Sequence, residues 1–256
     1  MHRLAVAVVF LFSVASAVAQ NPASDPLAVS LAQQSVAALA GGVTISDVTL
    51  NASVISIFGS DNGSGTATLK AKGITESRVD LNLGGGTRSD VRNTASGSPG
   101  GAWEKNGGTS APYAGHNCWT DAAWFFPALS SLMQTANPNF IFKYIGQEQH
   151  GGVNTQHIRI FQVQGGVSLM QHLSAADFYL DPVSSLPVAI AFQVHPDTDA
   201  GTDIAAEVRF ANYQPVNGIQ VPFHIQRMLD GGVVLDVTVT NAIFNTGLAD
   251  STFSLP

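Results

Sequence analysis

Cysteine and charged residues are both scarce in this sequence. Cys118 is the one cysteine in 256 residues, so no disulfide can form within the chain. Charged residues make up 11% of the sequence, where about a quarter is typical, and the formal net charge is −7 without a cluster of Lys and Arg. Because nucleic-acid binding depends on clustered cations that neutralise phosphates, the composition argues against DNA or RNA as a partner.

Apolar runs long enough to cross a membrane are also missing, since a spanning helix needs roughly 20 apolar residues. The longest run, residues 4–14, is shorter, follows His2 and Arg3, and leads to the small-x-small pattern Ala17-Val18-Ala19. These features predict a signal peptide at 1–19, cleaved after Ala19. We expect residues 20–256 to form one soluble, periplasmic or secreted domain and not an integral membrane protein. An uncleaved anchor is the alternative.

A helix is predicted at the start of the mature chain. Asp25 suits the N-cap, Pro26 suits the first helical position, and Gly41-Gly42 would end the helix. Apolar residues between 27 and 40 cover much of its circumference, so we expect the helix to be largely buried.

From residue 43 onward, apolar and polar residues alternate with a period of two, which is typical of half-buried strands. Asp230-Gly231 indicates a tight hairpin. The glycine-rich stretches 84–86 and 96–101 lack the lysine and the following helix of a phosphate loop, so we interpret them as hairpin connections. The predicted strands are 43–57, 66–70, 78–83, 87–92, 140–147, 155–164, 176–180, 187–195, 204–213, 219–229 and 233–244. Periodicity does not determine their order in a sheet.

The most apolar part of the mature chain lies in its middle. A helical insertion is predicted near 119–134, with Thr120 or Asp121 as its cap, and Pro127 should kink it or break it into two short helices. Together with the first helix and the two runs of strands, this insertion indicates an α+β fold. We expect a curved antiparallel β-sheet, a half-barrel, wrapped over the helices.

Several turns and strands of the C-terminal half resemble a known family. They are DFYLDP at 177–182 with LPV at 186–188, FANYQPVNGIQVP at 210–222, and the closing stretch 245–256. These segments are similar to a strand, turn and "LP" step, a Y-x-x-V-x-G-x-x-x-P hairpin and an F-x-L/P tail of the lipoprotein-carrier (LolA/LppX/MucB-like) superfamily. The chain as a whole also resembles exported proteins of soil acidobacteria.

This resemblance implies an open half-barrel whose concave face holds helices and an apolar cavity for acyl chains or a partner's lipidated end. The long insertion 95–133 and the N-terminal half depart from the family pattern, so the ligand stays open. Seven residues of the middle segment would form a wall or lid of such a cavity, or would simply be part of the core: Trp119, Trp124, Phe125, Phe126, Leu129, Leu132 and Met133.

A nucleophilic site is a weaker hypothesis. His116 and Cys118 are two positions apart and could act as base and nucleophile, but the spacing marks no third residue to orient the base. A buried free thiol is the simpler interpretation. We therefore assign no catalytic residue.

The histidines of the mature chain show no metal-site spacing, and we interpret them as scattered structural or surface residues. His172 with Asp177, or His150 with His157, could meet across strands. The acidic stretch 197–203 lacks the glutamate that closes a helical calcium loop and is typical of a solvated turn. No metal and no cofactor is predicted. The histidines concerned are His116, His150, His157, His172, His195 and His224.

The sequence therefore favours an exported, non-enzymatic binding or carrier protein for a lipid-like or apolar ligand, with a lipid or a lipidated protein as its partner. One alternative is a secreted hydrolase or metal-dependent enzyme that uses His116, Cys118 or the other histidines. Another is an envelope interaction module that binds a protein through a sheet edge. The chain has no nucleophile elbow, zinc-helix motif or spaced carboxylate pair, which favours the carrier.

Overall fold

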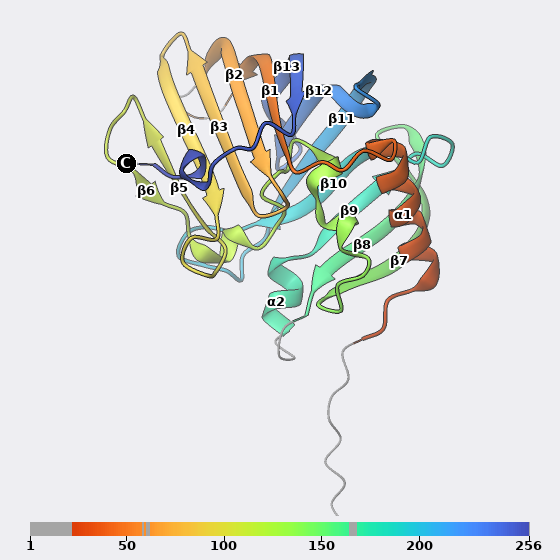
Figure 1. Ribbon diagram of the computed structural model, residues 1–256. Coiled ribbons are helices and arrows are strands. Elements are labelled where there is room, and N and C mark those ends of the chain that lie inside the picture. The colour runs from red at the N-terminus through yellow and green to blue at the C-terminus, as the bar shows by residue number, and fades with distance from the viewer. Residues whose placement is uncertain (1–21, 58, 60–61, 164–167, 256) are drawn as a thin grey trace, which may run out of the picture.

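The strands of this computed structural model, which describes residues 22–57, 59, 62–163 and 168–255, belong to one antiparallel sheet (Figure 1). The predicted signal peptide lies outside the described residues. The strands are β1 (Asp47–Ser56), β2 (Gly63–Lys72), β3 (Glu76–Leu83), β4 (Gly86–Asn93), β5 (Gly100–Lys105), β6 (Ala111–Pro112), β7 (Phe140–His150), β8 (Val153–Gln162), β9 (Ala176–Leu180), β10 (Pro187–Val194), β11 (Ile204–Val216), β12 (Ile219–Leu229) and β13 (Gly232–Phe244).

Two meanders meet in the middle of this sheet. The order is β6-β5-β4-β3-β2-β1-β13-β12-β11-β10-β9-β8-β7, so the first strand pairs with the last. That pairing runs from Val48 opposite Phe244 to Ser56 opposite Leu235, with a register shift between Asn51 and Ala52. As a result, β6 and β7 lie at opposite edges, and the connection 113–139 must cross one face of the sheet.

The connection 113–139, which lies within the described residues, contains three 3₁₀ turns and no α-helix: η1 (Gly115–Cys118), η2 (Pro127–Leu129) and η3 (Ser131–Gln134). The helical insertion that the sequence predicts near 119–134 is therefore present as short 3₁₀ turns and not as α-helix. Pro127 begins η2, so the expected break at this proline is confirmed.

The fold is consequently mostly β and not the expected α+β. Besides α1 (Pro26–Ala40), the described residues contain one further short α-helix, α2 (Ser168–Leu173), and a 3₁₀ turn η4 (Asp250–Phe253) after the last strand. The sheet is a single open layer that is neither closed nor strongly curled. No helix in the described part of the chain is long and apolar enough to cross a membrane.

Helix α1 confirms the predicted element and its ends but not its expected burial, since Leu27 is 51% exposed and the buried residues are Ala28, Ala32, Ser35 and Leu39. Pro26 lies in its first turn, and Gly41 ends it in the left-handed conformation with φ of 56°. A side chain on Gly41 would lie 2.2 Å from the carbonyl oxygen of Gly218, so this close approach to the β11–β12 turn requires glycine. Asp25 is at the N-cap position, but its carboxylate accepts a hydrogen bond from the backbone N–H of Tyr144 in β7 at 3.0 Å.

One face of the sheet, called here the inner face, packs against α1 and the connection 113–139. Helix α1 contacts β7, β8 and β12, and it also contacts η2 and η3. Alternate residues of the strands point into this core, as the period of two predicts. Fully buried examples from five strands are Leu50, Leu69, Val208, Ile225 and Val237.

The C-terminal residues lie against the opposite, outer face. Turn η4 contacts β3 and β4 (Figure 1), and Arg78 donates to the carbonyl oxygens of Thr252 and Ser254 at 3.3 and 3.2 Å. Upstream of η4, the buried carboxylate of Asp47 accepts hydrogen bonds from the backbone N–H groups of Thr246 and Gly247 at 2.8 and 3.0 Å. These contacts tie the end of the chain to the middle of the sheet.

Candidate functional site

The predicted ligand residues all lie on the part of the connection that runs from η1 to η3, Gly115–Gln134, called here the covering segment. Four of the seven are essentially inaccessible to solvent and belong to the main core: Phe125, Phe126, Leu129 and Leu132. Trp119 and Trp124 are partly buried, and Met133 is 40% exposed. The structure thus gathers most of the set on the inner face, packed as core. Their role as walls of a ligand cavity stays a prediction.

Trp124 connects this apolar cluster to a charged one. Its ring meets Phe125 edge to face, with ring centres 5.5 Å apart, and the guanidinium carbon of Arg227 lies 4.9 Å from the centre of the same indole. Arg227 projects from β12 onto the inner face, opposite Val208. Among the described residues we find no carboxylate paired with it. Burial lowers the pKa of Arg227, although nearby Tyr113 and Asp90 favour its charged form.

Strands β4 and β5 bring further charges to the inner face. Arg88 makes a two-pronged ion pair with Asp90, at 2.8 and 2.9 Å, and its guanidinium lies 4.7 Å from the ring centre of Trp103. The hydroxyl of Tyr113 donates to the same carboxylate, and burial, reinforced by Asp90, raises the pKa of Tyr113 well above its usual value. Lys105 is the direct neighbour of Arg88 across the strands. Arg88, Asp90 and Tyr113 thus form one hydrogen-bonded cluster beside the covering segment.

Two polar residues anchor the covering segment itself. Arg92 in β4 donates to the carbonyl oxygen of Thr120 at 3.0 Å. Asp121 accepts hydrogen bonds from the backbone N–H and the hydroxyl of Ser131, each at 3.0 Å, and so closes the loop between them. Burial raises the pKa of Asp121 to about 6, although the Ser131 bonds and Arg92 work in the opposite direction.

We call this charged group the arginine corner, and it consists of Arg88, Arg92, Arg227, Asp90 and Asp121. It holds three guanidinium groups and two carboxylates, in a chain whose formal net charge is −7. The local excess of positive charge faces the apolar cluster of the covering segment. An anionic group that entered this corner would find donors already in place.

The sequence analysis did not identify the arginine corner, although the part of it that lies on one strand can be recognised from the sequence. Arg88, Asp90 and Arg92 alternate along one strand, and a period of two places all three side chains on one face. Their register with Leu81, Val79 and Ser77 of β3 shows that this is the inner face. Arg227 lies on a strand distant in sequence, and only the tertiary fold brings it to the same place.

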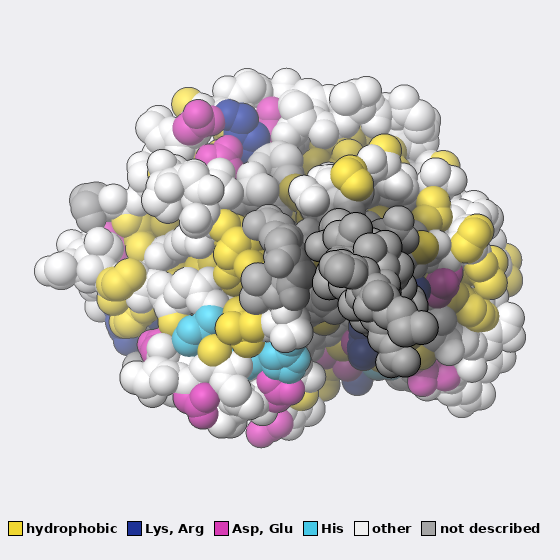
Figure 2. Space-filling view, turned by 90° about the horizontal axis from the view of Figure 1, so that it is seen from below, with side chains coloured by type: hydrophobic (Ala, Val, Ile, Leu, Met, Phe, Trp, Pro, Cys, Tyr) yellow, Lys and Arg dark blue, Asp and Glu magenta, His cyan; other side chains and the backbone are white. Residues whose placement is uncertain are grey.

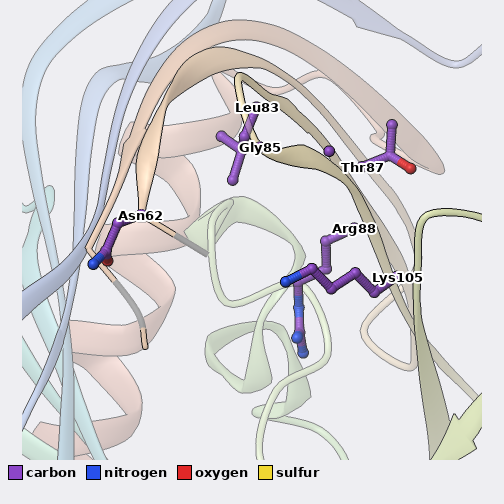
Figure 3. Close-up of a pocket in the computed structure, with 7 residues that line it drawn as sticks. Asn62, Leu83, Gly85, Thr87, Arg88 and Lys105 are labelled. Atoms are coloured by element: carbon purple, nitrogen blue, oxygen red, sulfur yellow. The ribbon is translucent and has the colours of Figure 1, made fainter. Parts of the chain in front are cut away.

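Of two cavities in the described structure, one is small and the other is polar. One borders the arginine corner and has a volume of about 10 Å³, room for roughly one water molecule (Figure 3). Its lining residues are Asn62, Leu83, Gly85, Gly86, Thr87, Arg88 and Lys105. A second, of about 490 Å³, lies at the β7–β8 hairpin and is lined by Gln147, Glu148, Gln149, Asn154, Thr155, Gln156 and Pro182. Neither is an apolar space for an acyl chain.

His116 and Cys118 do not form a nucleophile–base pair. The Nε2 atom of His116 lies 3.0 Å from the carbonyl oxygen of Pro196, and the thiol of Cys118 faces the carbonyl oxygen of Ala114 at 3.7 Å. Cys118 is 3% exposed, and burial raises the pKa of its thiol. The interpretation as a buried free thiol is confirmed, and the protonated thiol is a poor nucleophile.

His150 and His157, which the sequence suggested could meet across strands, share a contact with the ring of Tyr179. His150 stacks on Tyr179 with ring centres 3.7 Å apart, and His157 contacts the same ring at 4.5 Å. Asp177 pairs with His157 at 2.7 Å and with Arg159 at 2.8 Å, and not with His172. This cluster joins β8 and β9 through charge and ring contacts.

The prediction of scattered histidines is wrong for a second cluster. His172 in α2 and His195 at the end of β10 both approach Asp203, and the ring of His116 lies 5.8 Å from that of His195. His172, His195 and Asp203 could hold a metal ion. Figure 2 shows histidine and acidic side chains gathered on this underside of the molecule.

The acidic stretch 197–203 forms the turn that the sequence predicts. Asp199 accepts hydrogen bonds from the backbone N–H of Gly201 at 2.8 Å and from the hydroxyl of Thr202 at 2.6 Å. Because Asp203 pairs with histidines, it is not simply a solvated turn residue.

Comparison with known proteins identifies relatives by structure alone. No protein-family model matches the sequence. No curated protein matches it either.

Solved structures do share the fold. A domain from Vibrio parahaemolyticus named for outer membrane lipoprotein sorting is 14% identical, with a TM-score of 0.55 over 89% of this chain and 96% of that one. A DUF1329 family protein from Desulfovibrio piger is 10% identical, with a TM-score of 0.54 over 91% and 98%. A LolA superfamily protein from Nitrosomonas europaea is 12% identical over 89% and 97%, at a lower TM-score of 0.48. The likeness of fold to the first two of these proteins extends over about nine-tenths of the chain.

Proposed function

We propose that this protein is an exported, non-enzymatic carrier that binds an amphiphilic, lipid-like ligand between the inner face of the sheet and the covering segment. The observation that carries the proposal is the construction of that segment. It places Phe125, Phe126 and Leu132 on the inner face without pairing with any described strand of the sheet. Apolar packing holds it there, and an apolar ligand tail can replace such packing. The shared fold of a domain named for lipoprotein sorting supports the same conclusion.

Binding requires the covering segment to move, because core side chains fill the inner face. Hydrogen bonds to other elements hold its first half, among them Arg92 to Thr120 O at 3.0 Å and Asn117 to His195 O at 2.8 Å. The backbone hydrogen bonds of its second half are local, such as Leu129 N–H to Phe126 O at 3.0 Å, so the second half is the part that a ligand would displace. Lifting the segment would expose aromatic surface to water, which costs roughly 25 cal/mol of free energy per Å² of exposed apolar surface. A ligand tail that covers this surface would offset that loss.

The arginine corner supplies the second half of the ligand's chemistry. Arg227 stacks on Trp124, which borders the apolar cluster, so one indole contacts both environments. A carboxylate or phosphate at the end of an acyl tail would fit this junction, because a guanidinium binds such groups with two parallel hydrogen bonds. We therefore assign the ligand to the acidic amphiphiles. Export through the predicted signal peptide would place the carrier where envelope lipids are found.

Labelling of Cys118 provides a direct test, because it is the one cysteine of the chain and is buried at the start of the covering segment. We expect a thiol reagent to react slowly with the free protein and at a different rate when a long-chain fatty acid is bound. Mass spectrometry of the protein purified from its native envelope should also recover an acidic lipid. Absence of any co-purifying lipid, together with no fatty-acid binding, would overturn the carrier proposal.

The role of the arginine corner is tested by paired variants on neighbouring strands. Arg227→Ala removes a guanidinium from the inner face, whereas Arg209→Ala removes one from the outer face of β11, where it pairs with Glu207. We expect Arg227→Ala to weaken fatty-acid binding by about tenfold or more, and Arg209→Ala to leave it unchanged. The methyl ester of the same fatty acid should not distinguish the variants. Equal losses in both would assign the effect to stability and not to recognition.

A further inference from the structure

The histidine cluster on the underside lies outside the proposed carrier site and brings together three separate parts of the chain. His172 comes from α2, His195 follows β10, and Asp203 precedes β11. The Nε2 atom of His172 is 2.8 Å from Asp203 Oδ1, and the Nδ1 atom of His195 is 3.4 Å from the same oxygen. One ligand atom from each of the three residues lies within 4.8 Å of the others.

His195 provides the strongest sign that a ligand is missing from this cluster. Its side chain is 1% exposed, and its Nε2 atom has no hydrogen-bond partner among the described residues. The other nitrogen, Nδ1, lies 3.1 Å from the carbonyl oxygen of Thr202. A neutral ring that donates from Nδ1 to this carbonyl keeps a lone pair on Nε2, and a buried lone pair without a partner is unfavourable.

The surroundings match those of metal-binding histidines. Such a histidine commonly donates its second ring N–H to a backbone carbonyl or a carboxylate, which fixes the ring. His195 has this contact with Thr202 O, and His116 has one with Pro196 O at 3.0 Å. Asn117 fixes the backbone of His195 from both sides, accepting from its N–H and donating to its carbonyl oxygen, each at 2.8 Å.

Zinc fits this donor set well. Two imidazoles and one carboxylate form a frequent three-residue zinc set, with a fourth position left for water, and each ligand atom lies about 2.0–2.2 Å from the metal. The 3.4 Å contact with Asp203 is made by Nδ1 of His195, so an ion bound at Nε2 requires His172 and Asp203 to shift toward that nitrogen. The buried His195 is held in place, while His172 and Asp203 are 42% and 45% exposed and can adjust to the ion.

We infer that His172, His195 and Asp203 form a binding site for a divalent transition-metal ion of the zinc type, with His116 beside it. The site joins α2, the β10–β11 loop and, through Asn117, the first turn of the covering segment. Its ligands belong neither to the apolar cluster nor to the arginine corner, so it exists independently of the carrier function.

Titration of the purified, chelator-treated protein with Zn²⁺ and Co²⁺ tests this inference. Calorimetry should show one equivalent of Zn²⁺ bound, and Co²⁺ should give the visible absorption of a four-coordinate ion. Affinity should fall in acidic buffer, because protons compete with Zn²⁺ for the ligand atoms. Absence of stoichiometric binding at neutral pH would overturn the site.

Variants separate the site from casual binding to surface histidines. His172→Ala, on an exposed helix position, should weaken Zn²⁺ binding by on the order of 100-fold while the far-UV spectrum and melting temperature of the metal-free protein stay close to wild type. His195→Ala should abolish the binding. His224→Ala is the matched control, because His224 also pairs with an aspartate, Asp236, at 3.0 Å, but this pair belongs to no three-residue ligand group among the described residues. An equal loss in His224→Ala, or wild-type affinity in His172→Ala, would refute the assignment.

Discussion

The two halves of the inner face are built from different chemistry. Under α1, β12 and the end of the covering segment, the face is closed by apolar side chains such as Phe126 and Leu132. At β4 and β5, the same face carries Arg88, Asp90 and Arg92. Apolar packing is strong but has no directional preference, whereas paired charges hold defined positions and lose much if one partner leaves. The first half therefore supplies packing energy, and the carrier proposal assigns ligand recognition to the second.

Among the variants that test this comparison, Phe126→Ala should have the largest effect on stability. Phe126 is fully buried and contacts Phe244, with ring centres 5.8 Å apart. Removing the ring leaves a cavity in the apolar half, so we expect the free energy of unfolding to fall by about 3–5 kcal/mol. Urea denaturation measures this change in the free energy of unfolding. A loss below about 1 kcal/mol would mean that the covering segment contributes little to the core.

Asp90→Ala should have the next largest effect, and it acts on the charged half. It leaves the Arg88 guanidinium and the Tyr113 hydroxyl without their acceptor. Both are only partly exposed, and we expect a loss of about 1–3 kcal/mol in the same denaturation experiment. Asp80→Ala is the control, because Asp80 forms the corresponding pair with Arg78 on the outer face. Equal losses would show that the inner-face pair is not special.

Asp121→Asn should raise the free energy of unfolding by about 1 kcal/mol at pH 7, whereas the two preceding variants lower it. The pKa of Asp121 is about 6 in the folded protein and about 3.9 in an unfolded chain. The folded state therefore holds the proton more tightly, and this contribution to stability is lost as the pH rises from about 4 to 6. Asparagine can still accept from Ser131, so the variant should be more stable than wild type at pH 7 and lose that advantage near pH 4.

Asp47 provides a comparison for this pH experiment, because its pKa is lowered where that of Asp121 is raised. Burial alone would raise the pKa of Asp47, but hydrogen bonds from Thr246, Gly247 and Ser46 outweigh it and lower the pKa. Its contribution is present above the unfolded pKa and is lost as the pH falls through the folded value. Asp47→Asn should therefore destabilise the protein most at neutral pH. If both variants shift stability in the same direction, the assigned causes are wrong.

Met133→Ala should have the smallest effect on stability. Met133 is on the covering segment but is 40% exposed, so we expect a change within about 0.5 kcal/mol. A thermal melt of the variant beside that of Phe126→Ala checks this difference. A large loss would contradict the boundary drawn between the buried and exposed sides of the covering segment.

Local elements followed from the sequence because local rules determine them. The strands β9 and β12 have the bounds that alternation predicts, and α1 has the expected proline and glycine at its ends. The short β5 and β6 were missed, since Gly100 and Gly101 resemble turn residues. The middle segment was assigned as helical because its apolar residues permit a helix, but the structure forms short 3₁₀ turns there, with Pro127 at the start of one of them.

The candidate sites show the same distinction between features that the sequence predicts and features that only the fold reveals. Sequence alone placed the aromatic residues near 119–134 in the interior, because so apolar a stretch must be buried. It could not place Arg227 beside Trp124, nor His195 beside His172 and His116. Those meetings depend on strand order, which the side-chain pattern of individual strands does not contain.

The sequence by itself determined a cysteine-poor, weakly charged chain of alternating strands, with a predicted export signal and one apolar middle segment. Tertiary structure decided that β1 pairs with β13 and that β6 and β7 become opposite edges. From this pairing follow the path of the covering segment over the inner face, the arginine corner and the histidine cluster. The physical reason is that alternation fixes which residues share a face of one strand, whereas contacts between distant strands arise only when the whole sheet is assembled.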